Sequence, residues 1–227
     1  MITGDGPVLV MAPHPDDEVL GPGGMVARLA DEGRAVYVTV VTHADPSIFP
    51  NYSLEAGRAE AVRADEVLGV RKTFFLEGFP AALLDTVPQS SLNAAVQEVI
   101  HQVEPEILLI PFPGDLHQDH RKVAEACMVA VRPNLETPVP VVWAYETLSE
   151  THWNAPPAPQ FRPTAYMDIS RHLERKLSAM AEYATQVKPF PHERSLEALR
   201  SLATSRGATV GLPAAEAFHV IRQIYPR

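Results

Sequence analysis

The sequence has very little of three things: cysteine, long apolar runs and clustered positive charge. Its 227 residues include one cysteine, Cys127, which excludes an internal disulfide and fits a reducing compartment. No stretch approaches the roughly 20 apolar residues of a membrane-spanning helix. With 19 Lys and Arg against 28 Asp and Glu, the net charge is -9, which argues against nucleic acid or an anionic membrane surface as the main partner.

The N-terminus also lacks the basic region of a signal peptide. Residues 1–6 carry no Lys or Arg, and the apolar run that follows meets His14 too soon for a signal sequence. We therefore expect a cytoplasmic protein. The apolar fraction of 46% is that of an ordinary soluble globule, and the length fits one α/β domain over residues 1–227.

Short apolar strands alternate with helical segments along the first two thirds of the chain. Strands are predicted at 8–13, 35–42, 72–76, 107–111 and 139–145, and helices at 25–30, 54–68, 92–103 and 123–131. This alternation predicts a Rossmann-like, doubly wound α/β fold, with a mainly parallel sheet and helices on both faces. Further helices, predicted at 170–186, 193–206 and 214–221, would form a helical C-terminal cover.

Two clusters of histidine and acidic residues directly follow predicted strands. The sequence His-Pro-Asp-Asp-Glu at 14–18 ends the first strand, and His-Gln-Asp-His at 117–120 follows the fourth. Ligands of doubly wound sheets bind beyond the carboxyl ends of the strands, so both clusters belong to one candidate site. Two histidines and one carboxylate, with a fourth position left to water, form a usual catalytic zinc site.

Each cluster alone has a simpler explanation. Acidic residues at a helix start complement the helix dipole, and histidines three positions apart are usually a surface coincidence. The residues alone also leave two other functions open. A two-metal phosphoesterase would need more ligands than these clusters supply, and a non-catalytic sugar-binding protein would have no use for Asp16 and His117.

The whole pattern resembles the PIG-L/LmbE-like zinc-dependent N-acetylglucosaminyl deacetylases. The resemblance covers almost the whole chain. It includes the PHPDDE and GxGG start, the later HxDH, the helix ending in Leu-Gly-Val at 68–70, the segment 183–186 and the closing Ala-Glu-Ala-Phe at 215–218. The combination of HPDDE with HxDH is highly specific.

The resemblance implies a role for each residue of the two clusters. It makes His14, Asp17 and His120 ligands of Zn²⁺, although such a set also suits Fe²⁺. It makes Asp16 the general base for the attacking water, which a bound cation would activate. His117 would stabilise the oxyanion or protonate the leaving amine.

Three further residues are expected to support the site. On physical grounds Asp119 would orient a histidine by a hydrogen bond rather than bind the metal, and the resemblance implies that Arg58 and Glu216 contact the substrate. The implied partner is a small amino-sugar substrate: the enzyme would remove the N-acetyl group of an N-acetylglucosamine-type sugar or its conjugate. Relatives of this family are often homo-oligomers.

The sequence also predicts the protonation states of Asp16 and His117, and it differs from the family pattern at one position. Near a divalent cation, Asp16 should remain ionised, and acidic neighbours at 115 and 119 should favour the cationic form of His117. Ala81 stands where the family has an acidic residue that contacts sugar hydroxyls. The identity of the N-acetyl sugar therefore stays open.

Overall fold

The computed structural model describes residues 4–133, 138–155 and 158–225. The helices of this part of the chain pack against a seven-stranded sheet. The strands of this sheet are β1 (Val8–Ala12), β2 (Val36–Val40), β3 (Lys72–Phe75), β4 (Ile107–Pro111), β5 (Val141–Tyr145), β6 (Ala165–Asp168) and β7 (Ala215–Gln223). Their order across the sheet is β3-β2-β1-β4-β5-β7-β6. All neighbours from β3 to β5 pair in parallel, and β7 runs antiparallel to both β5 and β6.

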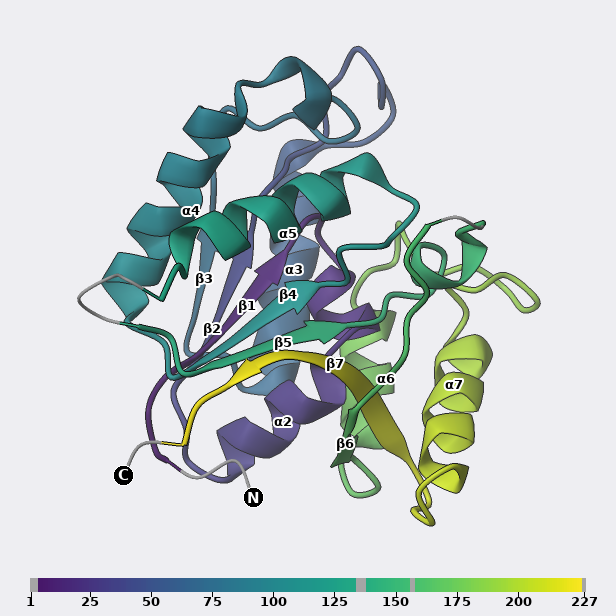
Figure 1. Cartoon of the computed structure of the whole chain (residues 1–227). Helices are drawn as coiled ribbons and strands as arrows, with labels where there is room; N and C mark the ends of the chain where they lie inside the picture. Colours follow the sequence, from purple (N-terminus) through teal and green to yellow (C-terminus); the bar gives the residue numbers. More distant parts are fainter. Residues whose placement is uncertain (1–3, 134–137, 156–157, 226–227) are drawn as a thin grey trace.

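Helices cover both faces of this sheet (Figure 1). They are α1 (Asp17–Leu20), α2 (Gly23–Asp31), α3 (Leu54–Leu68), α4 (Gln89–Val103), α5 (Gln118–Ala130), α6 (Leu173–Ala181) and α7 (Leu196–Ala208), with short 3-10 turns η1 (Leu84–Thr86) and η2 (Thr151–Trp153). Within the described residues, no helix combines the length and apolar character that crossing a bilayer requires.

Alternate residues of β1 face the two layers of helices. Val8 and Val10 pack in the core formed with α2, α3 and α6, whereas Leu9 and Met11 pack in the core formed with α4 and α5. Because both faces are covered, β1 and β4 are buried at every position and their sequences are continuously apolar. The predicted doubly wound, mainly parallel α/β fold is confirmed.

The chain order creates a switch point between β1 and β4. The chain moves outward from β1 to β2 and β3 on one side, then returns to β4 and continues to β5 on the other. The loops that follow β1 and β4 therefore diverge from each other and leave a crevice at the carboxyl edge of the sheet. Both clusters of histidine and acidic residues lie on these two loops and on the first turns of the helices that follow, α1 and α5.

The C-terminal region corrects the sequence-based prediction. The helix predicted at 214–221 is strand β7, and strand β6 was not predicted at all. Alanine and glutamate favour a helix locally, but this segment pairs with strands on both sides. Residues 215–218 are all buried, so the strand shows no alternation of apolar and polar residues. The helical cover consists of α6 and α7.

Glu216 on β7 joins three elements of the fold. Its buried carboxylate accepts the backbone N–H groups of Gly24 and Met25, each at 2.7 Å, at the start of α2. The Lys176 ammonium on α6 donates to the same carboxylate at 2.6 Å, and also to the carbonyl oxygens of Leu20 and Gly21. These contacts give Glu216 a structural role; the substrate contact that the resemblance implies has no counterpart among them.

The variant Glu216→Gln keeps the shape of the side chain and removes its charge. We expect it to lower the free energy of unfolding by about 3 kcal/mol, because Lys176 stays buried as an unpaired cation. Urea denaturation measures this change. The matched control Glu125→Gln, on the exposed side of α5, should change stability by less than about 0.5 kcal/mol. Equal stability of Glu216→Gln and the parent would contradict the structural role.

Candidate metal centre and active-site pocket

A sharp turn after β1 separates the two adjacent carboxylates of the first cluster. The backbone N–H of His14 donates to Asp17 Oδ2 at 2.8 Å, which closes the turn. Asp16 has φ 113° and ψ -22°, a conformation uncommon for residues other than glycine. As a result, Asp17 lies against the histidines, whereas Asp16 lines the neighbouring pocket.

His14, Asp17 and His120 form a compact group of possible metal ligands. Asp17 Oδ2 lies 3.3 Å from His14 Nδ1 and 3.2 Å from His120 Nε2, and one donor atom from each residue lies within 4.8 Å of the others. His120 Nε2 is buried and makes no hydrogen bond. A histidine that binds a metal directs the lone pair of one ring nitrogen at the ion, so that nitrogen makes no hydrogen bond to the protein. The buried Nε2 of His120, which faces a carboxylate, fits this description.

The other nitrogen of each ring is held by a second carboxylate. His14 Nε2 lies 3.0 Å from Asp119 Oδ2, and His120 Nδ1 lies 2.9 Å from Asp115 Oδ2. Histidines that bind metals usually donate their second ring N–H to such a partner, which fixes the ring and its tautomer. The contact of Asp119 agrees with its predicted orienting role. The contact of Asp115 with His120 was not predicted.

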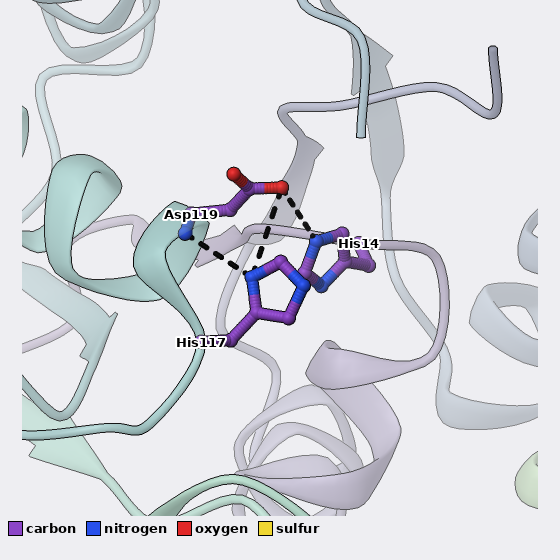
Figure 2. Close-up of side chains that lie close together, drawn as sticks. All are labelled: His14, His117 and Asp119. Atoms are coloured by element: carbon purple, nitrogen blue, oxygen red, sulfur yellow. Dashed lines mark hydrogen bonds and ion pairs between the residues drawn. The ribbon is translucent and has the colours of Figure 1, made fainter. Parts of the chain in front are cut away.

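A second group, His14, His117 and Asp119, also lies close enough to hold an ion. Figure 2 shows both imidazole rings next to the Asp119 carboxylate. In this group, however, His117 Nδ1 already accepts the backbone N–H of Asp119 at 3.1 Å, and Asp119 Oδ2 accepts the N–H of Ala82 at 2.7 Å. In the first group, the ring nitrogens of His14 and His120 that face Asp17 accept no backbone N–H, so this group fits a cation better.

The electrostatics of the first group also favour a cation. Burial by itself would lower the pKa of both histidines, but the carboxylates around them outweigh burial and raise the pKa of His14 to about 9 and that of His120 to about 10. The pKa of Asp17 is lowered in turn, because the two rings outweigh the effect of its burial. Three carboxylates around two rings therefore attract positive charge, for which a metal ion and protons compete.

A pocket of about 250 Å³ adjoins this group. It is lined by His14, Pro15, Asp16, Ala44, Phe49, Tyr52, Ala81, Ala82, His117, Glu150, Gln186 and Arg194. Asp16 is only 1% exposed, and its Oδ2 lies 3.3 Å from Arg194 Nη1. Burial raises the pKa of Asp16 to about 7, against the opposing effect of Arg194. A cation held by the adjacent residues would lower this pKa and restore the ionised form that the sequence predicted.

The prediction that the cationic form of His117 is favoured is wrong. Burial and, next to it, the charge of the neighbouring His14 lower the pKa of His117 to about 4. Asp115 contacts His120 instead, and Asp119 lies 3.8 Å from His117 Nδ1. Because Nδ1 accepts the backbone N–H of Asp119, the neutral ring carries its proton on Nε2, where it can act as a hydrogen-bond donor.

Three polar residues of the pocket were missed by the sequence analysis as site residues: Glu150, Gln186 and Arg194. Arg194 lies on the loop between α6 and α7, and donates to Gln186 Oε1 at 2.8 Å and to Ser149 Oγ at 3.4 Å. Glu150 follows β5 and is 8% exposed, and burial raises its pKa. Gln186 belongs to the segment 183–186 of the family resemblance, but it received no role there. Nothing in the sequence pattern marks Glu150 or Arg194.

Arg58 lies near the pocket without lining it. It is on α3, pairs with Glu77 at 2.5 Å and stacks over the ring of Phe75 at 5.2 Å. It lines a small separate cavity that shares Pro15, Ala44 and Tyr52 with the active-site pocket. The structure therefore brings His14, Asp16, Asp17, His117, Asp119 and His120 together, and places Arg58 and Glu216 outside that group.

Comparison with known proteins gives this site a family. The family model PIG-L, described as GlcNAc-PI de-N-acetylase, matches residues 9–131. The diacetylchitobiose deacetylase of Thermococcus kodakarensis is 27% identical over 242 residues, which cover 96% of this chain and 84% of that protein. A probable N-acetyl-alpha-D-glucosaminyl L-malate deacetylase of Bacillus anthracis is 26% identical over 190 residues, covering 79% and 80% of the two chains.

Solved structures share the fold across the whole chain. A conserved protein of Thermus thermophilus has a TM-score of 0.78 at 24% identity, with 97% and 96% of the two chains covered. The 4-carboxy-2-hydroxymuconate hydratase of Pseudomonas putida has a TM-score of 0.75 at 22% identity, with 98% and 97% covered. These likenesses show the fold alone, which carries more than one reaction. Because the family model spans more than half of the chain and the named relatives are deacetylases, this chain belongs to the PIG-L (GlcNAc-PI de-N-acetylase) family and is an N-deacetylase.

Proposed function

We propose that this protein is a metal-dependent hydrolase that removes the N-acetyl group from an N-acetylglucosamine-type amino sugar or its conjugate. The observation that carries the proposal is the arrangement of the pocket. A group of two histidines and one aspartate adjoins it, and a buried carboxylate and a neutral histidine line it. The products are acetate and the free amine of the sugar, and the proposed unit is a single domain over residues 1–227.

His14 Nδ1, Asp17 and His120 Nε2 are the proposed ligands of the metal, with Zn²⁺ as the preferred ion and Fe²⁺ as the alternative. Their partners support this choice: Asp119 and Asp115 hold the outer nitrogens of the two rings. A divalent cation bound there would polarise the amide carbonyl and lower the pKa of a water molecule to about 7. The His14–His117–Asp119 group shares His14 with it, so the described residues offer no independent second metal site of the kind a two-metal phosphoesterase needs.

Asp16 is the proposed general base. It lines the pocket next to the proposed ligand Asp17, and a cation held there would keep its carboxylate ionised and able to accept a proton. The Asp16 carboxylate accepts a proton from the attacking water, and the protonated form can then deliver this proton to the leaving amine. Arg194, next to Asp16 Oδ2, holds the carboxylate in the pocket.

His117 is the proposed donor to the amide oxygen. Its low pKa makes it neutral near pH 7, and its Nδ1 is engaged by the backbone of α5. The proton on Nε2 is therefore available for the negative charge that develops on the carbonyl oxygen. This role needs no cationic imidazole, unlike the role expected from the sequence.

The pocket also indicates how the sugar binds. The two named relatives act on N-acetylglucosamine-type compounds, diacetylchitobiose and an N-acetylglucosaminyl malate. Phe49, Tyr52 and Ala81 give the pocket an apolar wall, on which the face of a sugar ring can stack. Glu150 lines the same pocket, and among the described residues its carboxylate accepts a hydrogen bond from Ser149 Oγ, at 3.5 Å. We assign Glu150 as the acceptor for a sugar hydroxyl. The family has an acidic residue for this contact at the position of Ala81, and alanine has no polar group.

The variants Asp16→Ala and His14→Ala separate the two parts of the mechanism. We expect Asp16→Ala to keep one metal ion per chain and to lose about 10²–10⁴-fold in kcat, because only the base is removed. His14→Ala should lose both the metal and the activity. Elemental analysis and a free-amine assay over a panel of N-acetyl sugars, with a chelator control, measure both effects. Parental activity of Asp16→Ala would refute the mechanism, and two metals per chain would favour a phosphoesterase.

Glu150→Gln tests the sugar contact separately from the chemistry. The introduced amide would still fill the space but would be a weaker acceptor than the carboxylate, so we expect KM to rise roughly tenfold with kcat within about threefold of the parent. The remote, exposed Glu125→Gln serves again as the control and should leave both constants unchanged. A loss confined to kcat would show that Glu150 acts in catalysis and not in sugar binding.

A further inference from the structure

The backbone of Asp16 has an unfavourable conformation. Its φ of 113° and ψ of -22° lie in a region that residues with a Cβ atom rarely adopt, and such a residue costs about 1–3 kcal/mol. The conformation has a clear effect, because it points two adjacent carboxylates to different places. Asp17 contacts the histidines, and Asp16 lines the pocket. Surrounding groups must therefore hold this peptide.

Glu18 holds the backbone N–H of Asp16. The Glu18 side chain is fully buried, and its Oε2 accepts this N–H at 3.2 Å. On the other side, the carbonyl oxygen of Asp16 accepts the N–H groups of Val19 and Leu20, at 3.0 and 2.8 Å. Both polar backbone groups of the strained residue are thus bonded, one by the first turn of α1 and the other by the side chain of Glu18.

Tyr183 holds the other oxygen of the same carboxylate. Its hydroxyl donates to Glu18 Oε1 at 2.5 Å, and the tyrosine is fully buried just after α6. The backbone carbonyl of Tyr183 also accepts the N–H of Gln186, which lines the pocket and binds Arg194. Neither Glu18 nor Tyr183 lines the pocket. Glu18 bonds to the backbone of Asp16, and Tyr183 bonds to Glu18, so together they connect Asp16 to the C-terminal part of the chain.

We propose that Glu18 and Tyr183 are positioning residues of the deacetylase. Tyr183 orients the Glu18 carboxylate, and Glu18 holds the strained backbone of Asp16 so that the Asp16 carboxylate faces the pocket. This inference rests on the proposed role of Asp16 as the general base. It adds two buried groups that support this base, the Glu18 carboxylate and the Tyr183 hydroxyl, neither of which lines the substrate pocket or contacts the two proposed ligand histidines.

Tyr183→Phe removes a single hydroxyl and keeps the ring. We expect kcat to fall roughly tenfold, because a small displacement of a catalytic group costs one to two orders of magnitude. KM and the metal content should stay unchanged. The matched control is Tyr145→Phe, which removes another fully buried hydroxyl, one that donates to the Met11 carbonyl at 2.8 Å. Its kcat should stay within about twofold of the parent at a temperature where both variants are folded.

A double-mutant cycle shows whether Tyr183 acts through Asp16. In the Asp16→Ala background, Tyr183→Phe should have no further effect on the residual rate, because the group it positions is gone. Glu18→Gln should keep kcat within about threefold, since its amide oxygen can accept the Asp16 N–H and its NH₂ can donate to the tyrosine oxygen. Glu18→Ala should lose at least as much as Tyr183→Phe.

Each result of this cycle has a definite meaning. Parental kcat in Tyr183→Phe, or an equal tenfold loss with and without Asp16, would overturn the positioning role while leaving the proposed function intact. Parental activity in Asp16→Ala alone would refute the general-base role, and the positioning role would fall with it. A loss in Tyr183→Phe that depends on Asp16 would support both.

Discussion

The structure depends on how negative charge is held at the carboxyl edge of β1 and β4. Asp17, Asp115 and Asp119 surround two imidazole rings: Asp119 and Asp115 bond to the outer nitrogens, and Asp17 lies between the two inner ones. Burying so many ionisable groups is costly unless they are paired or bind a cation. The fold accepts this cost where the two halves of the sheet diverge, and the proposed chemistry follows from it.

Asp16 and Asp17 are adjacent in one turn but have different proposed roles. The left-handed backbone of Asp16 sends its carboxylate into the pocket, while Asp17 remains with the histidines. The C-terminal third contacts this turn at two residues. The Tyr183 hydroxyl donates to Glu18, and Arg194 pairs with the Asp16 carboxylate in the pocket. The late segments of the chain thus complete a site whose proposed metal ligands all lie within residues 14–120.

The sequence was sufficient for the parallel core and for the two clusters. Continuous apolar strands followed by polar turns are a strong signal, and β1 and β4 lie where this pattern predicts. It failed at β7, where a fully buried segment rich in alanine has a local preference for helix that strand pairing overrides. It also could not find Arg194, because the contact of Arg194 with Asp16 joins two loops that meet only in the folded chain. The contact of Asp115 with His120, five residues further on, depends on the shape of the turn that leads from β4 into α5.

The location of a bound metal tests the central claim most directly. Anomalous diffraction at the zinc edge, from crystals of the protein loaded with one equivalent of Zn²⁺, gives the position of the ion without reference to activity. We predict a single peak bonded to His14 Nδ1, Asp17 and His120 Nε2, with Asp16 unbound beside it. A peak bonded to His14 Nε2, His117 and Asp119 would contradict it, because the proposed ligands and the proposed hydrogen-bond donor would then have exchanged roles.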